Sequence, residues 1–174
     1  MNRGVALVAV AAILVSGCGY ALEGRGITSD PSIKRIGVPL FEDETGVVDL
    51  DARVTEAVVG ELLRRGRFTV VKEATGVDAV VDGTITAFDV VPINFTSSGE
   101  VTEATRYAIT LRASVAYRKV GEREPIWENS AVSIRDEYDL DDSEAGFFDR
   151  EDQSIERLAE SFARRLVAAM LEAF

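Results

Sequence analysis

The alternating stretch YAITLRASVAY, residues 107–117, decides the fold of this chain of 174 residues. Its odd-numbered positions are apolar or aromatic, whereas its even-numbered positions are small or polar. Because successive side chains of a strand point to opposite faces, the pattern predicts a strand with one core face and one outward face. Such a strand is typical of an antiparallel sheet that is covered on one side only.

Further strands are expected on both sides of this stretch. Runs of β-prone apolar residues predict strands over residues 34–41, 67–72, 79–91 and 126–138. Pro92 is expected either to end the third of these or to place it at a sheet edge. The polar segment 94–103 is expected to be a loop that turns near Gly99.

Two helices complete the predicted domain. The first spans residues 50–65, with Asp49 as its N-cap and Gly66 just beyond its end. The second runs from near Arg150 to the C-terminus, with Asp149 as its cap. Its apolar stripe, which begins at Ile155, is expected to cover the sheet, although a coiled coil is the alternative.

The order of these elements predicts an α+β fold over residues 31–174, in the sequence β-α-β-β-β-β-α. The first strand, helix and strand form a right-handed crossover, and the later strands pair as antiparallel neighbours. We therefore expect a two-layer sandwich in which a mixed sheet of four to five strands carries both helices on one face.

The N-terminal sequence predicts export and lipidation. Arg3 precedes an apolar run over residues 5–15, and the small residues Ser16 and Gly17 stand before Cys18. The pattern is that of a signal peptide over residues 1–17. Its apolar run is too short for a membrane-spanning helix. Residues before the cysteine resemble the bacterial lipobox, which implies acyl chains such as palmitate on Cys18. An ordinary secreted protein with a stray cysteine, or an uncleaved anchor, is the alternative.

The composition excludes several classes of function. The formal net charge of −11 opposes binding to nucleic acid phosphates. The chain contains no histidine, which removes the usual catalytic triads and most zinc sites. The acidic runs 42–46 and 139–149 are interpreted as solvated loops, with a cation site as the alternative. We therefore expect no enzymatic activity, no metal and no cofactor other than the covalent lipid.

Several short motifs, in order, resemble the LptE family of lipopolysaccharide-assembly lipoproteins. They are GCGYAL at 17–22, IGVPLFE at 36–42, LLRRGRF at 62–68, AVVDG at 79–83, GEV at 99–101, IWEN at 126–129 and RDEY at 135–138. The resemblance implies a non-enzymatic protein that sits as a plug inside the large β-barrel LptD and contacts lipopolysaccharide. It also implies the periplasmic side of the outer membrane, with residues 18–30 as a lipidated N-terminus and short tether; Gly19 after the cysteine favours that membrane.

The same resemblance implies basic residues near the sheet as partners of lipopolysaccharide phosphates. The candidates are Arg106, Arg112, Arg118 and Lys119, on or beside the clearest strand. Ordinary solvated charges on a sheet face are the alternative interpretation.

A second family remains open on sequence grounds. Residues 36–41, the following helix and residues 67–71 also resemble the α/β unit of CsgG-like lipoproteins and of activators of peptidoglycan synthases. Those proteins act as secretion-pore subunits or enzyme regulators. An activator normally carries a long linker after its cysteine, and residues 19–30 are short by comparison.

Overall fold

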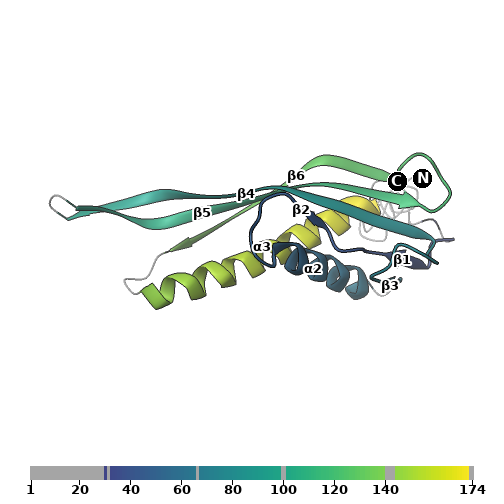
Figure 1. The fold of residues 1–174 in the computed structure, drawn as a ribbon, viewed down its shortest axis with the longest axis horizontal. Coiled ribbons are helices and arrows are strands. Elements are labelled where there is room, and N and C mark those ends of the chain that lie inside the picture. Colours follow the sequence, from purple (N-terminus) through teal and green to yellow (C-terminus); the bar gives the residue numbers. More distant parts are fainter. Residues whose placement is uncertain (1–29, 31, 66, 99–100, 140–143, 173–174) are drawn as a thin grey trace, which may run out of the picture.

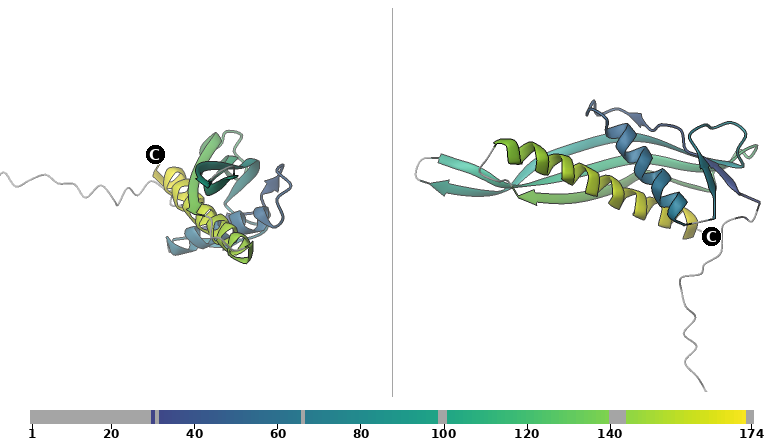
Figure 2. Two further views of the ribbon diagram at one scale, coloured as in Figure 1. Left: turned by 90° about the vertical axis from the view of Figure 1, so that its left-hand side faces the viewer. Right: turned by 90° about the horizontal axis from the view of Figure 1, so that it is seen from below.

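The computed structural model describes residues 30, 32–65, 67–98, 101–139 and 144–172. Its elements are β1 (Arg35–Gly37), β2 (Glu42–Asp43), α2 (Leu50–Arg64), β3 (Thr69–Val71), β4 (Ala79–Ser98), β5 (Val101–Lys119), β6 (Trp127–Asp139) and α3 (Glu144–Glu172). Both helices lie against the same face of the sheet (Figures 1 and 2). The predicted α+β sandwich with two helices on one face is confirmed.

The sheet is mixed and has six strands, in the order β3-β1-β4-β5-β6, with β2 also paired to β4. β1 runs parallel to β3 and β4, whereas β4, β5 and β6 form an antiparallel meander. The crossover β1-α2-β3 was therefore predicted correctly. The extra strand is β2, which the sequence placed in a loop: Glu42 and Asp43 pair with Thr84 and Ile85 before the chain turns.

The first helix has nearly the predicted extent, and Asp49 is its N-cap residue by position but not through its side chain. Asp49 has a left-handed φ of 59°, and its side chain makes no capping hydrogen bond. Its carbonyl oxygen instead accepts the Arg53 amide at 3.0 Å. Aspartate is one of the few residues that adopt this conformation readily, so Asp49 occupies the N-cap position through its backbone alone. The predicted C-cap, Gly66, lies outside the described residues.

The hairpin of β4 and β5 is much longer than expected, because strand pairing continues through the segment predicted as a loop. Pro92 does not end β4 but faces Tyr107 on β5, with register shifts on the C-terminal side of the proline. Beyond Ile85, β4 pairs only with β5 among the described residues, so Pro92 lies on an edge strand. The hairpin projects beyond the helical layer (Figure 1).

The second helix starts earlier than predicted, at Glu144, so Asp149 lies inside it and is not its cap. Part of the expected acidic loop is therefore helical, and residues 140–143 lie outside the described part. Glu144 and Ala145 are favourable at a helix start, the first for the helix dipole and the second for propensity. These preferences outweigh Gly146, whose presence had indicated a loop.

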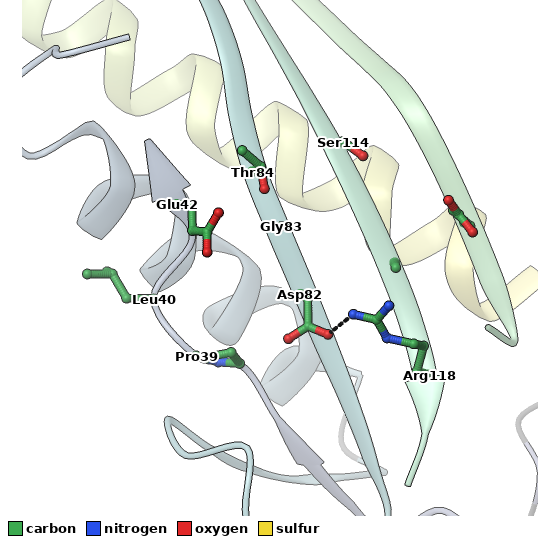
Figure 3. A pocket seen from close by; sticks show the side chains of 10 residues that line it. Pro39, Leu40, Glu42, Asp82, Gly83, Thr84, Ser114 and Arg118 are labelled. Carbon is green, nitrogen blue, oxygen red and sulfur yellow. Dashed lines mark hydrogen bonds and ion pairs between the residues drawn. The ribbon is translucent and has the colours of Figure 1, made fainter. Parts of the chain in front are cut away.

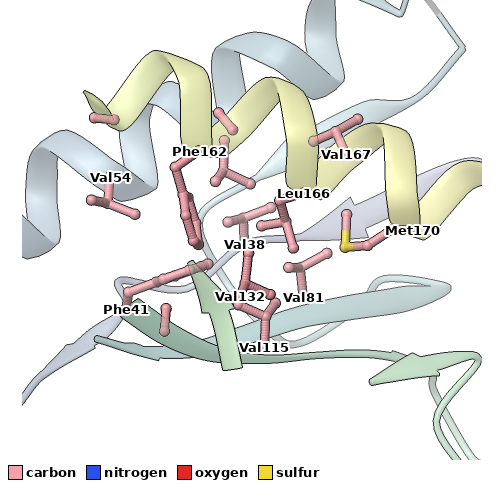
Figure 4. Close-up of a cluster of buried hydrophobic side chains, with 14 of the residues drawn as sticks. Val38, Phe41, Val54, Val81, Val115, Val132, Phe162, Leu166, Val167 and Met170 are labelled. Atoms are coloured by element: carbon pink, nitrogen blue, oxygen red, sulfur yellow. The ribbon is translucent and has the colours of Figure 1, made fainter. Parts of the chain in front are cut away.

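The core lies between the helices and the inner face of the sheet (Figure 4). The apolar stripe of α3 is confirmed, since Leu158, Phe162, Leu166 and Met170 are all fully buried. The odd-numbered apolar residues of β5 face this stripe and are buried as predicted: Ile109, Leu111, Ala113, Val115 and Tyr117. Each large buried side chain stabilises the fold by roughly 1.5–3 kcal/mol. The helix thus covers a sheet rather than entering a coiled coil.

Phe41 ties the segment between β1 and β2 to both layers. Its side chain is 1% exposed, and its ring occupies the space over Gly83 on β4. Its amide donates to Thr55 Oγ1 at 3.0 Å, and that hydroxyl donates to the Asp51 carbonyl at 2.7 Å. The hydrogen bonds and the ring together fix the position of β2 beside β4.

Candidate functional site

The outer face of the sheet, opposite the helices, is the surface on which the predicted basic residues fall. Arg106, Arg112 and Arg118 occupy even-numbered positions of β5, whose odd-numbered neighbours are buried in the core. Successive arginines are six residues apart, which is about 20 Å along a strand. The structure therefore distributes them along the face instead of gathering them into one cluster.

Each of the three arginines is held by an aspartate on a neighbouring strand. Arg106 contacts Asp139 at 2.6 Å, and this pairing raises the pKa of the guanidinium. Arg112 contacts Asp89 on β4 at 2.9 Å. Arg118 contacts Asp82 on β4. An incoming phosphate would have to compete with a carboxylate at each of these positions.

Lys119 directly follows Arg118 at the end of β5 and pairs with residues outside the neighbouring strands. Its ammonium contacts Asp30 at 2.6 Å and Glu122 at 3.4 Å. The hydrogen bond from Lys119 lowers the pKa of Asp30 to about 2, and the same bond raises the pKa of Lys119. This pair fastens the start of the domain to the end of β5.

A hollow of about 530 Å³ opens on the outer face, between the β1–β2 connection and strands β4 to β6 (Figure 3). Small side chains form its floor, because Thr84 faces Ser114 there and Ala116 lies beside them. Its full lining is Pro39, Leu40, Glu42, Asp82, Gly83, Thr84, Ser114, Ala116, Arg118 and Glu128. The Arg118 guanidinium contacts Asp82 at 2.5 Å inside it.

Sequence reasoning missed this hollow, although a signal was present. The even-numbered positions of the central strand were recognised as small and polar, and Ser114 and Ala116 are among them. The strand β2, which supplies Glu42 and raises one wall, was not predicted. Without that wall the small residues indicate only a flat polar face.

A second unpredicted feature lies on the projecting hairpin. Four large apolar side chains are exposed there, from 37% at Val90 and Ile93 to 45% at Val91 and 55% at Phe95. We call these residues the hairpin strip. The alternation of Ile93 and Phe95 with polar neighbours could have indicated a strand, but Pro92 and the polar residues after it favoured a loop. Exposed apolar groups gathered on one element mark contact surfaces.

The predicted lipidation site, Cys18, and the signal peptide before it lie outside the described residues. Within the described ranges no helix is both long and apolar enough to cross a membrane. The same ranges hold no group of three or more His, Cys, Asp or Glu side chains placed to bind a metal ion.

The fold and its surfaces define a class of protein: a two-layer α+β domain with a polar sheet face and a projecting hairpin. Comparison with known proteins identifies the family within this class. A family model described as LptE, lipopolysaccharide-assembly, matches residues 33–170. The chain therefore belongs to the LptE family, a family of non-enzymatic lipoproteins, and the resemblance inferred from the short motifs is confirmed.

Solved structures are similar to this chain at low sequence identity. A protein from Xanthomonas campestris is 9% identical, with a TM-score of 0.57 over 83% of this chain and 90% of that one. The rare lipoprotein B from Shewanella oneidensis is 16% identical, with a TM-score of 0.44 over 80% and 92% of the two chains. No curated protein matches the sequence.

Proposed function

We propose that this chain plugs an LptD-like outer-membrane β-barrel, assists the assembly of that barrel and so serves lipopolysaccharide transport to the cell surface. The observation that carries the proposal is the LptE family match, which extends over residues 33–170. In this role the protein is a structural partner and not an enzyme, and it needs no cofactor.

The surface chemistry of the domain supports a position inside a polar lumen. Three arginines on the outer face are already paired with Asp82, Asp89 or Asp139. A face of paired charges can meet a polar wall without leaving an isolated charge in a confined space. The hairpin strip supplies apolar contact area at one end of the domain.

The anchor is proposed to be a set of acyl chains on Cys18, on the periplasmic side of the outer membrane. Several acyl chains give stable membrane attachment, whereas one chain gives only marginal binding. The Lys119–Asp30 pair fixes where the domain begins, so the tether over residues 18–29 reaches at most about 40 Å when fully extended. The domain would therefore work close to the membrane surface.

Direct contact with lipopolysaccharide is proposed for Arg106, Arg112, Arg118 and Lys119. The expected mechanism is exchange, in which a lipid phosphate replaces the aspartate that holds a guanidinium. Neutralising Arg106 and Arg112 together to Gln should weaken lipopolysaccharide binding. Arg64→Gln combined with Arg164→Gln, which removes two guanidinium groups paired with Glu61 and Glu160 on the helices, is the matched control. Equal affinity of the control and the double variant would contradict a role for these residues.

Affinity purification from the native envelope tests the proposed function. The tagged mature chain should recover an integral β-barrel protein in a one-to-one ratio, identified by mass spectrometry. Recovery of a peptidoglycan synthase without a barrel would favour the regulatory role of the second family. Recovery of neither would contradict both assignments.

A further inference from the structure

We propose that residues 26–29, which we call the entry segment, dock against the end of the sandwich beside Tyr117 and give the Tyr117 hydroxyl its hydrogen-bond partner. Their sequence is Gly-Ile-Thr-Ser, and they lie outside the described residues, immediately before Asp30. The docking stands apart from the proposed function, and only its consequence for the membrane anchor rests on that function.

The Tyr117 hydroxyl is a buried polar group without a partner in the described part of the chain. Tyr117 is 2% exposed, and its hydroxyl oxygen makes no hydrogen bond with any described residue. Buried hydroxyl groups are nearly always hydrogen-bonded, because taking such a group out of water without a partner is costly. A phenylalanine would fill the same space without this cost. The hydroxyl therefore indicates a partner from outside the described residues.

Asp30 fixes the place at which the entry segment joins the fold. Its Oδ2 accepts a hydrogen bond from Lys119 at 2.6 Å. Lys119 lies two residues after Tyr117 on β5, so the two side chains point to the same face of the sheet. Burial raises the pKa of Tyr117 to about 12, and the Asp30 carboxylate adds to this increase, as expected for neighbouring groups. Thr28 and Ser29 lie within about 7 Å of Asp30 along the chain, which places a hydroxyl within reach of the phenol.

The surface beside Tyr117 is apolar and only partly covered. Trp127 on β6 pairs directly with Tyr117, so their side chains share one face of the sheet. The Ile126 amide donates to the Tyr117 carbonyl at 2.8 Å. Trp127 and Ile126 pack against the core but are only partly buried. Ile27 precedes the two hydroxyl residues of the entry segment, so its side chain can cover this surface while a hydroxyl reaches the phenol.

The consequence for the anchor follows from the length of chain that stays free. Docking shortens the free tether from residues 18–29 to residues 18–25, which span at most about 28 Å. With acyl chains on Cys18, as proposed above, the end of the sandwich at Tyr117 would then face the membrane. The tip of the β4–β5 hairpin lies at the other end of β5 and would point away from it.

Amide hydrogen exchange of the full mature chain in detergent micelles, followed by NMR, tests the docking. The amides of Thr28 and Ser29 should be protected in the parent chain. Tyr117→Phe should accelerate their exchange about two- to tenfold, which corresponds to the loss of one hydrogen bond. Ile27→Ser should accelerate it about tenfold, because the docked state loses a buried apolar side chain. Ile27→Ser should also increase acrylamide quenching of Trp127, the only tryptophan of the chain.

The matched controls make the same chemical changes in the part of the tether that stays free. Tyr20→Phe and Leu22→Ser should leave both the exchange and the quenching unchanged. Unprotected Thr28 and Ser29 amides in the parent chain would overturn the proposal, as would equal effects of the controls. Unchanged exchange and quenching in a folded Tyr117→Phe chain would assign the hydroxyl to a buried water instead. Since no barrel is present, the result is independent of the co-purification.

Discussion

Replacing Gly83 by alanine tests the packing on which the position of β2 depends. A Cβ at Gly83 would lie 2.2, 2.4 and 2.6 Å from three carbons of the Phe41 ring. Carbon atoms normally approach to about 3.5–4.0 Å, so the ring would have to move by about 1 Å or more. The ring has little room, because it is 1% exposed and the Phe41 amide is bound to Thr55.

The expected magnitude follows from two opposing effects. Overpacking of a core costs about 1–3 kcal/mol. Removing a glycine from a strand restores about 0.5–1 kcal/mol of conformational entropy. We expect Gly83→Ala to lower the free energy of unfolding by about 1–2 kcal/mol, measured by urea unfolding followed by circular dichroism.

A matched control and a rescue variant separate this mechanism from a general effect of alanine. Gly60 lies in α2 with open space around its Cβ position, so Gly60→Ala should stabilise the protein by about 1 kcal/mol. In a Phe41→Leu background, Gly83→Ala should cost less than about 0.5 kcal/mol, because the clashing ring is gone. A Gly83→Ala protein as stable as the parent would refute the packing argument.

Three further predictions concern hydrogen bonding, acid stability and anchoring. Thr55→Val should lower the free energy of unfolding by about 1–3 kcal/mol, because the buried Phe41 amide loses its acceptor, whereas Thr55→Ser should retain stability. Two backbone amide donors lower the pKa of Asp78, so its stabilising effect is present above about pH 4 and disappears in acid; Asp78→Asn should reduce the difference in urea midpoint between neutral and acidic solution. Cys18→Ala should leave a folded domain that no longer sediments with membranes, and membrane retention without the barrel would contradict the anchor.

The parts of the fold that could be predicted are those in which burial repeats with a clear period. The alternation from Tyr107 to Tyr117 specified the central strand and its inner face, and the stripe from Ile155 onward specified the covering helix. These signals are strong because one face of each element is sequestered from water while the other is not. The crossover formed by β1, α2 and β3 followed from the order of the segments.

The parts that failed lack such a one-sided environment. Residues 91–95 of β4 are all exposed, so no buried face opposes a polar one there, and Pro92 with the polar residues after it led to the interpretation as a loop. β2 is two residues long and acidic, and only its partner Thr84–Ile85 makes it a strand. The hollow depends on that strand, so the small residues Ser114 and Ala116 could not reveal it by themselves.

Pro92 has a consequence for the behaviour of the isolated chain. A long strand with one unpaired edge is normally a template on which further copies can add and grow into fibrils. Proline offers no amide hydrogen, so in the middle of the open edge of β4 an approaching strand finds a missing donor, followed by an irregular register. We therefore expect the isolated chain to resist self-polymerisation along this edge of β4.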